Sequence, residues 1–276
     1  MNLFEYTFFQ NALIGILIIS IAAGIIGTYI TTRRLVSISG GITHACFGGL
    51  GLGYYLGISP IIMAGVFAVV ASFGVEWLAQ RHRVREDSAI AVVWALGMAI
   101  GVLFIFLTPG YVPELNSFLF GNILTISTAD IVAFGVYTVV LAALFAVYGR
   151  QIVMIAFDRD FARIAGLPVK SISTIMTVMI ALAIVLTIRM VGIMLLLSML
   201  SLPPMIAEIF SSRFNRIMAL ATVISAVTCV TGIITSACID VPCSAVIVIL
   251  QVIAYALSRV SAAIILRYNK RRLTDV

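Results

Sequence analysis

Charged residues are scarce in this sequence. Asp, Glu, Lys and Arg make up 10% of the 276 residues, whereas soluble domains carry about 25%. Apolar residues make up 62% and mean hydropathy is +1.20. These figures exclude a soluble globular enzyme, a disordered chain and a nucleic-acid-binding protein. A spanning helix with its loop takes roughly 25–35 residues, so the chain holds about eight to ten such helices and no soluble domain.

Known catalytic motifs are missing as well. The sequence has no Gly-x-x-x-x-Gly-Lys phosphate-binding loop, and its two lysines, Lys170 and Lys270, lie outside any such context. It has no Gly-x-Ser-x-Gly elbow and no His-Glu-x-x-His motif. We therefore expect a protein that is not an enzyme and holds no intrinsic cofactor. Any ATP hydrolysis that accompanies its function must come from another chain.

Cysteine is also infrequent, with four residues in the chain. A disulfide framework is typical of short, loop-rich secreted proteins, which this chain does not resemble. Cys46 and Cys229 lie inside apolar runs, where cysteine commonly serves as a small apolar side chain.

Long apolar runs dominate what is present. Eight are long enough to span a bilayer, at about 11–32, 61–79, 89–107, 129–148, 171–189, 191–209, 216–237 and 244–265. A ninth segment, Gly40–Gly57, is short and rich in glycine. Its periodicity does not separate a full span from a re-entrant segment. We expect an all-α polytopic membrane protein of eight to nine transmembrane helices, with residues 1–276 as a single transmembrane domain.

Positive charge is distributed unevenly along the chain. If the first span runs from outside to inside and 40–57 crosses, all Lys and Arg residues except Arg189 fall on the inner side. Their segments are 33–39, 80–88, 149–170, 210–216 and 259–276. Inner loops of membrane proteins carry such an excess of Lys and Arg. The net charge of +6 therefore reflects topology, with the N-terminus outside and the C-terminus in the cytoplasm if nine spans form, and not a nucleic-acid partner.

The segment Gly40–Gly57 carries the strongest functional signal. Histidine inside an apolar span is costly and is a functional candidate by default, and imidazole is the commonest metal ligand. His44 is such a residue; the alternative is a histidine bonded to a backbone carbonyl of the next helix. Small residues also recur every four positions, a pattern that lets helices pack closely. They are Gly41, Ala45, Gly49, Gly53 and Gly57.

Three charged residues stand out near the ends of the runs. Asp240 lies between Cys238 and Cys243, so it could bind a soft or borderline metal with them or cap an outer turn. Glu76 is expected to pair with an arginine of the cluster that follows it, Arg81 or Arg83. Arg189 is expected to extend toward the outer interface.

The inner segment 149–170 contains a short amphipathic helix, which Gly166 and Pro168 end. It mixes both charge signs with aromatic residues one turn apart. Its prominent residues are Phe157, Asp158, Arg159, Asp160, Phe161, Arg163 and Gly166. Such a helix either lies on the membrane surface or docks into a groove of a soluble partner, and the residues alone favour neither.

Taken together, these motifs resemble the membrane permease subunit of the bacterial ABC importers for zinc, manganese and iron. The resemblance covers about residues 10–265. It rests on Arg33-Arg34 followed by Gly40-Gly-Ile-Thr-His44-Ala, on Phe120-Gly-Asn-Ile-Leu, on Phe157 through Leu167, on Gly192 through Ser198 with Leu202-Pro203, and on Asp240-Val-Pro-Cys-Ser-Ala-Val-Ile-Val.

This resemblance implies a permease of the bacterial cytoplasmic (inner) membrane. It implies a second permease copy, most simply a homodimer, an ATP-binding subunit on the cytoplasmic face and an extracytoplasmic metal-binding protein. The segment 157–168 matches the family's coupling element, which favours docking to the ATPase. His44 matches the family's intramembrane histidine. Many members carry an aspartate four residues earlier, where this chain has Gly40, so Cys46 or Asp240 would have to supply another ligand.

We therefore expect a permease that moves a divalent ion of zinc, manganese or iron inward by alternating access, with ATP bound only on the partner subunit. His44, Cys46 and Asp240 are the expected path residues. Two alternatives stay open. One is a permease for chelated metal or a cobalamin-like cargo. The other is an ATP-independent, proton-coupled secondary transporter in which His44 relays protons.

Overall fold

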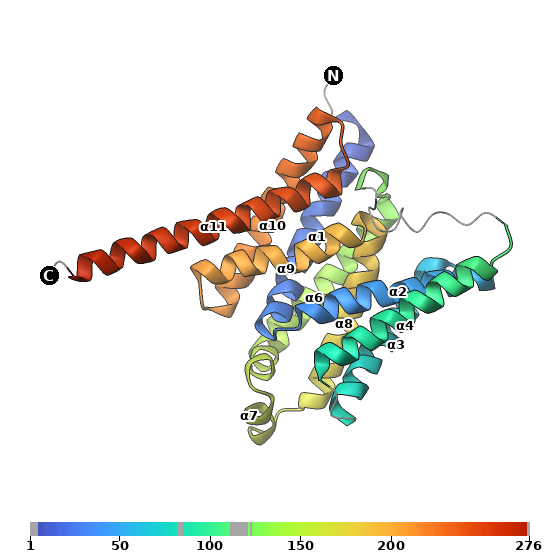
Figure 1. Cartoon of the computed structure of the whole chain (residues 1–276), viewed down its shortest axis with the longest axis horizontal. Helices are drawn as coiled ribbons and strands as arrows, with labels where there is room; N and C mark the ends of the chain where they lie inside the picture. The colour runs from blue at the N-terminus through green and yellow to red at the C-terminus, as the bar shows by residue number, and fades with distance from the viewer. Residues whose placement is uncertain (1–4, 82–84, 111–120, 122, 275–276) are drawn as a thin grey trace.

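Long helices account for nearly all of the fold (Figure 1). The computed structural model describes residues 5–81, 85–110, 121 and 123–274. Over these residues it contains no strand. The helices are α1 (Thr7–Thr32), α2 (Val36–Leu56), α3 (Pro60–Arg81), α4 (Glu86–Leu107), η2 (Ile123–Thr125), α6 (Thr128–Phe157), α7 (Arg159–Ile164), α8 (Val169–Val191), α9 (Ile193–Phe210), α10 (Phe214–Ile239) and α11 (Cys243–Thr274).

The expected polytopic all-α architecture is confirmed. Eight of the described helices are long and apolar enough to cross a membrane, and they correspond to the eight apolar runs. The glycine-rich segment 40–57 lies in α2, a continuous helix of 21 residues. At 1.5 Å per residue this is about 31 Å, close to the thickness of the hydrocarbon core. Length therefore permits α2 to span, and its crossing stays a prediction.

The inner segment 149–170 differs from the expectation in its first half. Helix α6 does not stop near Tyr148 but continues through Gly149 to Phe157. The separate helix is consequently shorter than expected, with α7 occupying only six residues. Asp158 caps it, because its Oδ1 accepts the backbone N–H groups of Asp160 and Phe161 at 3.0 and 2.9 Å. Gly166, at φ +78°, follows the helix end and allows the left-handed turn toward α8.

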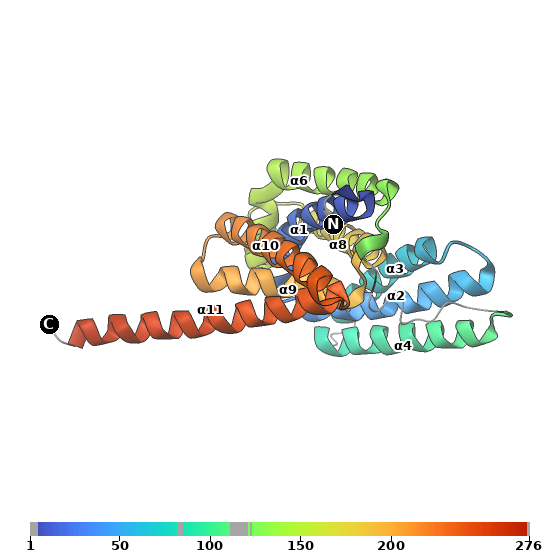
Figure 2. The same ribbon diagram turned by 90° about the horizontal axis from the view of Figure 1, so that it is seen from above.

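The long helices form two packed groups, which Figures 1 and 2 both separate. Helices α2, α3 and α4 pack mainly on one another, and we call them the three-helix unit. Helices α1, α6, α8, α9, α10 and α11 form the main bundle, in which α1 is the most buried. The two groups meet chiefly where α3 packs on α8.

Small residues explain the tight packing inside the three-helix unit. A Cβ atom on Gly97 of α4 would lie 2.5 Å from Cα of Ala45 in α2, which leaves no room for a side chain. Gly53 is equally close to the start of α3, with its would-be Cβ 2.6 Å from Cα of Pro60. Backbones that approach this closely gain dispersion contacts that larger residues would prevent. The unit therefore behaves as one packed body.

Candidate functional site

His44 projects from the middle of α2 toward α4. Its imidazole stacks on the indole of Trp94, with ring centroids 4.8 Å apart and planes 16° apart. Phe47 lies on the same helix at 6.3 Å and 17°. The Nδ1 atom of His44 is buried and has no hydrogen-bond partner among the described residues. The aromatic rings thus fix the plane of the imidazole and leave a ring nitrogen that can bind a ligand.

Free space lies on one side of the His44 ring. A Cβ atom on Gly40, one turn earlier, would meet only Leu197 Cδ2 of α9, at 3.9 Å. Gly48, one turn later, is closely covered, because its would-be Cβ lies 2.7 Å from the Phe67 ring and 3.0 Å from the Gly97 carbonyl oxygen. Of the two glycines one turn from His44, Gly40 has room for a side chain and Gly48 does not.

Cys46 does not share the environment of His44. It is buried and lines a small cavity between α2, α3, α8 and α9, together with Leu50, Ile61 and Val185. Residues two apart on a helix point to nearly opposite sides. A single ion therefore cannot contact both side chains in this arrangement.

Asp240 lies at the exposed turn between α10 and α11, at the top of Figure 1 and away from α2. It has a left-handed backbone conformation, φ 54°, and forms the C-cap of α10. The Ser236 hydroxyl donates to the Val241 carbonyl oxygen at 2.6 Å and closes the turn. No group of three His, Cys, Asp or Glu side chains that could hold a metal ion occurs within the described residues. The ligand roles of Cys46 and Asp240 stay predictions.

The small residues that recur every four positions in α2 face two different neighbours. Gly41 lies against Ile90 of α4, whereas Gly49 and Gly53 lie against the first turns of α3. Ala45 is fully buried beneath Gly97. Gly57 has no neighbour within 4 Å and instead ends α2 at φ +69°.

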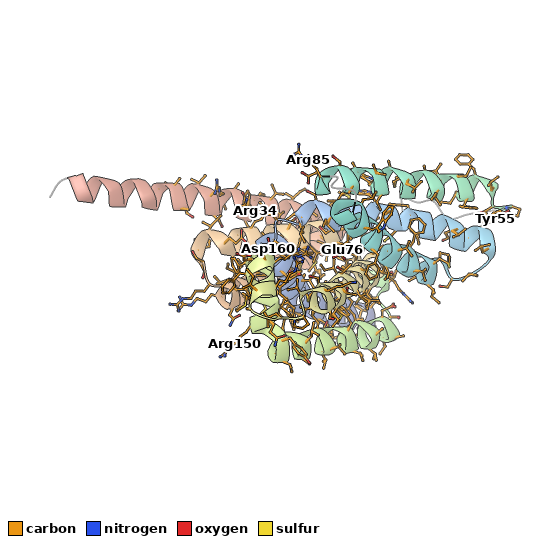
Figure 3. The ribbon with its side chains drawn as sticks, turned by 90° about the horizontal axis from the view of Figure 1, so that it is seen from below. Arg34, Tyr55, Glu76, Arg85, Arg150 and Asp160 are labelled. Atoms are coloured by element: carbon orange, nitrogen blue, oxygen red, sulfur yellow. The ribbon has the colours of Figure 1, made fainter. Side chains whose placement is uncertain are left out.

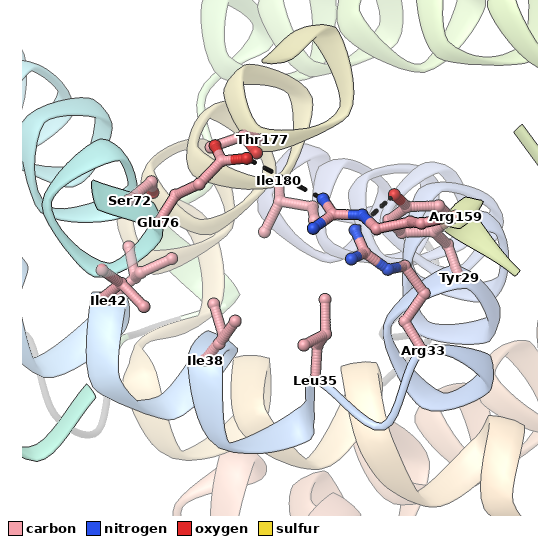
Figure 4. Close-up of a pocket in the computed structure, with 11 residues that line it drawn as sticks. Tyr29, Arg33, Leu35, Ile38, Ile42, Ser72, Glu76, Arg159, Thr177 and Ile180 are labelled. Atoms are coloured by element: carbon pink, nitrogen blue, oxygen red, sulfur yellow. Dashed lines mark hydrogen bonds and ion pairs between the residues drawn. The ribbon is translucent and has the colours of Figure 1, made fainter. Parts of the chain in front are cut away.

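A cavity of about 60 Å³, lined by both apolar and charged side chains, lies where the two helix groups meet (Figure 4). Helices α1, α2, α3, α7 and α8 all contribute to its lining. Arg159 Nη2 lies 3.8 Å from Glu76 Oε1 and 3.1 Å from the Ser173 hydroxyl, to which it donates. Arg33 donates to the Tyr29 hydroxyl at 3.0 Å. The described ion pair of Glu76 is thus with Arg159; the side chains of Arg81 and Arg83, its expected partners, lie outside the described residues.

Comparison with known proteins identifies the family of this chain. The model of the ABC 3 transport family matches residues 5–262. The chain belongs to the ABC 3 transport family. The resemblance seen in the sequence motifs is therefore confirmed.

Individual relatives of this ABC 3 family chain match along nearly its whole length. An uncharacterized membrane protein of Synechocystis sp. is 36% identical over 255 residues, which cover 92% of this chain and 90% of that protein. The manganese transport system membrane protein MntC of Halalkalibacterium halodurans is 30% identical over 258 residues, covering 93% and 88%. A chain of PsaBC from Streptococcus pneumoniae, solved in complex with Fab, superimposes with a TM-score of 0.82 at 25% identity, covering 93% and 92%.

In this ABC 3 family chain, α7 and the last residue of α6 present an apolar surface. Phe161 and Ile164 of α7 are 57% and 86% exposed, and Phe157 at the end of α6 is 67% exposed. Within α7, Arg163 and Asp160 form an exposed ion pair at 3.5 Å. Helix α7 lies at the lower edge of the molecule in Figure 1, so Asp160 faces the viewer near the middle of the view from below, whereas Tyr55 marks the far tip of the three-helix unit (Figure 3). The exposed apolar side chains suit a protein partner better than water.

Some residues of the family permease were not anticipated from the sequence. Arg189 does not simply extend outward, because its Nε lies 2.7 Å from Asp130 Oδ1 at the start of α6. Trp94 carries no motif that links it to His44. Gly97 and Gly101, which both press on the α2 backbone, are spaced as Gly-x-x-x-Gly, a pattern that the sequence does display.

Proposed function

We propose that this chain is the permease subunit of an ABC importer that moves a divalent transition-metal ion into the cytoplasm. One observation carries the proposal. His44 holds a buried ring nitrogen without a hydrogen-bond partner among the described residues, in a chain whose relatives include a manganese transport system membrane protein. A buried polar atom without a hydrogen-bond partner in a membrane helix costs free energy. Transient binding of the transported ion to this nitrogen gives the chain a reason to have histidine at position 44.

The transport mechanism follows from how few ligands His44 has nearby. A neutral imidazole binds divalent transition metals through the lone pair of one nitrogen. An ion that must leave again requires weak, sequential contacts rather than a closed four-ligand cage. His44 serves as one such contact, and alternating access exposes it first outside and then inside. Asp240, at an exposed turn, serves as an outer contact, and Cys46 as a contact that becomes available when helices shift.

The partners follow from the charge distribution and from α7. The exposed apolar side chains of α7 receive an ATP-binding subunit, which supplies the ATP hydrolysis that this chain has no motif to perform. Basic residues at the same ends of the helices support a cytoplasmic location of that face, with α2 crossing and the N-terminus outside the inner membrane. A second copy of the chain and an extracytoplasmic metal-binding protein complete the importer. Manganese is the first ion to test, ahead of zinc and iron, because a relative is named for it.

The deciding experiment is metal accumulation in proteoliposomes. Vesicles containing the chain, its ATPase and its binding protein are supplied with ATP and Mn²⁺, Zn²⁺ or Fe²⁺. We expect ATP-dependent uptake of one ion, reduced at least about tenfold by His44→Ala because the path loses a metal contact, a difference of about 1.4 kcal/mol. Phe106→Ala is the matched control, since Phe106 is 86% exposed on the outside of α4.

The same vesicles separate the alternatives. Uptake that is unchanged in His44→Ala would show that the metal contact lies outside α2. Uptake driven by a pH gradient without ATP would replace the importer with a proton-coupled transporter. Accumulation of a metal chelate in the absence of free-ion uptake would identify the chelate permease.

A further inference from the structure

The contact between the three-helix unit and the main bundle is loosely packed at both ends. At one end lies the cavity of about 60 Å³ that α2 and α3 form with α1 and α8. At the other end lies the smaller cavity beside Cys46, again between α2, α3 and α8. Close-packed interiors resist displacement, whereas a boundary with voids permits it at lower cost. The three-helix unit is therefore placed to shift relative to the main bundle.

An ion pair crosses this boundary. Arg159, the first residue of α7, lies beside the main bundle and reaches Glu76 in the last turns of α3. The other ion pairs between described side chains do not cross it. Arg163 and Asp160 belong to the same short helix, and Arg189 and Asp130 join α8 to α6 inside the main bundle.

Arg159 connects three helices at one point. Its backbone belongs to α7, its Nη2 atom donates to the Ser173 hydroxyl of α8 at 3.1 Å, and the same atom lies 3.8 Å from the Glu76 carboxylate of α3. Both charged side chains are partly buried, at 33% and 27% exposure. The hydrogen bond to Ser173 holds the guanidinium beside α3, and an ion pair at this distance tolerates small changes in helix separation without being lost.

Movement of Glu76 would reach His44 through close backbone contacts. Helix α3 packs against α2 at Gly49 and Gly53, where no side chain intervenes. On its other side α2 packs against α4 at Gly97, beside the Trp94–His44 stack. A displacement of α3 therefore carries α2, Trp94 and the imidazole with it, because these backbones have no free space in which to slip.

We propose that the Arg159–Glu76 ion pair transmits movement of α7 to the three-helix unit and so sets the position of His44. Arg159 and Glu76 are then positioning residues that convert ATPase movement into exposure of the metal contact. This inference rests on the proposed function, in which the ATPase docks at α7. Arg33 lines the same cavity, but its guanidinium bonds the Tyr29 hydroxyl of its own helix and makes no described ion pair with Glu76.

The test measures metal ions transported per ATP hydrolysed in the reconstituted importer. We compare wild type, Glu76→Gln, Arg159→Gln and the exchanged pair Glu76→Arg with Arg159→Glu, using Mn²⁺ as the probe. Each single variant is expected to lower the ratio at least tenfold, and the exchanged pair is expected to recover at least a third of the wild-type ratio. Glu208→Gln is the matched control, because it removes one exposed carboxylate from α9 without touching the boundary.

The outcomes distinguish this inference from the function on which it rests. No ATP-dependent uptake of Mn²⁺, Zn²⁺ or Fe²⁺ by the wild type would overturn the proposed function itself. Wild-type uptake together with an unchanged ratio in both single variants would overturn only the role of the ion pair. Uptake and ATP hydrolysis lost together in the single variants, with no recovery in the exchanged pair, would show a merely structural contact and would also overturn it.

Discussion

At the scale of single residues, the proposed metal contact at His44 depends on the residue one turn before it. Side chains four residues apart on a helix lie about 5–6 Å apart at Cβ, so a carboxylate at position 40 could share an ion with the imidazole. This chain has glycine there, and the surrounding space is open. His44 consequently has no second ligand on its own helix face.

We predict that Gly40→Asp strengthens metal binding. The new side chain fits, because a Cβ at this position meets only Leu197 Cδ2, at 3.9 Å, and its negative charge attracts the cation. The apparent KM for Mn²⁺ uptake should fall about tenfold, equivalent to roughly 1.4 kcal/mol, while the maximal rate also falls because release slows. Gly40→Asn has nearly the same size without the charge. Equal KM values for the two variants would contradict the prediction.

The residues of the site differ in how far the sequence could reveal them. His44 could be found because an imidazole in an apolar run is costly. Trp94 could not, since its stacking on His44 depends on how α2 and α4 are aligned, 50 positions apart along the chain. The partners of Arg189 and Glu76 are separated from them by 59 and 83 positions, and a charge pattern alone does not select among distant partners.

At the scale of helices, glycine contacts hold α2 against α4. A side chain at Gly97 would overlap the Ala45 backbone, so Gly97→Leu should force the helices apart. Such overpacking costs about 1–3 kcal/mol, and we expect the melting temperature of the purified protein in detergent to fall by roughly 5 °C. Gly135→Leu in α6 is the control, because no atom lies within 4 Å of its would-be Cβ. Equal melting temperatures for the two variants would argue against the close contact.

Helix positions were largely predictable, because a run of about 20 apolar residues has few other stable structures in a membrane. Two helices extend further: α11 continues nine residues beyond the expected end at position 265, and α6 continues nine residues beyond the expected end at Tyr148. Gly149 suggests a break, but it costs only about 1 kcal/mol inside a helix, and the residues after it still form a regular helix. Ile152 and Ile155, which are almost fully buried, help to hold this extension against the core.

At the scale of the whole molecule, the division into a three-helix unit and a main bundle was not predictable from the sequence. Hydropathy and charge determine which segments enter the membrane and on which side their ends lie. They do not determine which helices touch, because all of them present similar apolar surfaces to lipid and to one another. The division depends on where small residues permit close approach, and it puts His44 in one body and α7 beside the other.

If transport requires the two bodies to move, a link between them must stop it. Ser72 of α3 and Thr177 of α8 line the same boundary cavity from opposite bodies. We replace both with Cys, and Cys238, the exposed native thiol, with Ser. A short bifunctional thiol reagent should then reduce Mn²⁺ uptake by at least about 90%, and reductant should restore it if the reagent forms disulfides with both thiols.

The control for this link joins two helices of the same body. Phe145 of α6 and Phe214 of α10 line one open cavity within the main bundle, with their ring centroids 6.3 Å apart, so a Cys pair at these positions can be bridged without connecting the two bodies. This bridge should leave uptake unchanged. If both bridges stop transport equally, the main bundle must itself deform during the cycle; if neither does, the boundary at α3 and α8 stays closed while the ion passes. Only inhibition by the Ser72–Thr177 bridge alone, reversed by reductant, agrees with movement of the three-helix unit as one body.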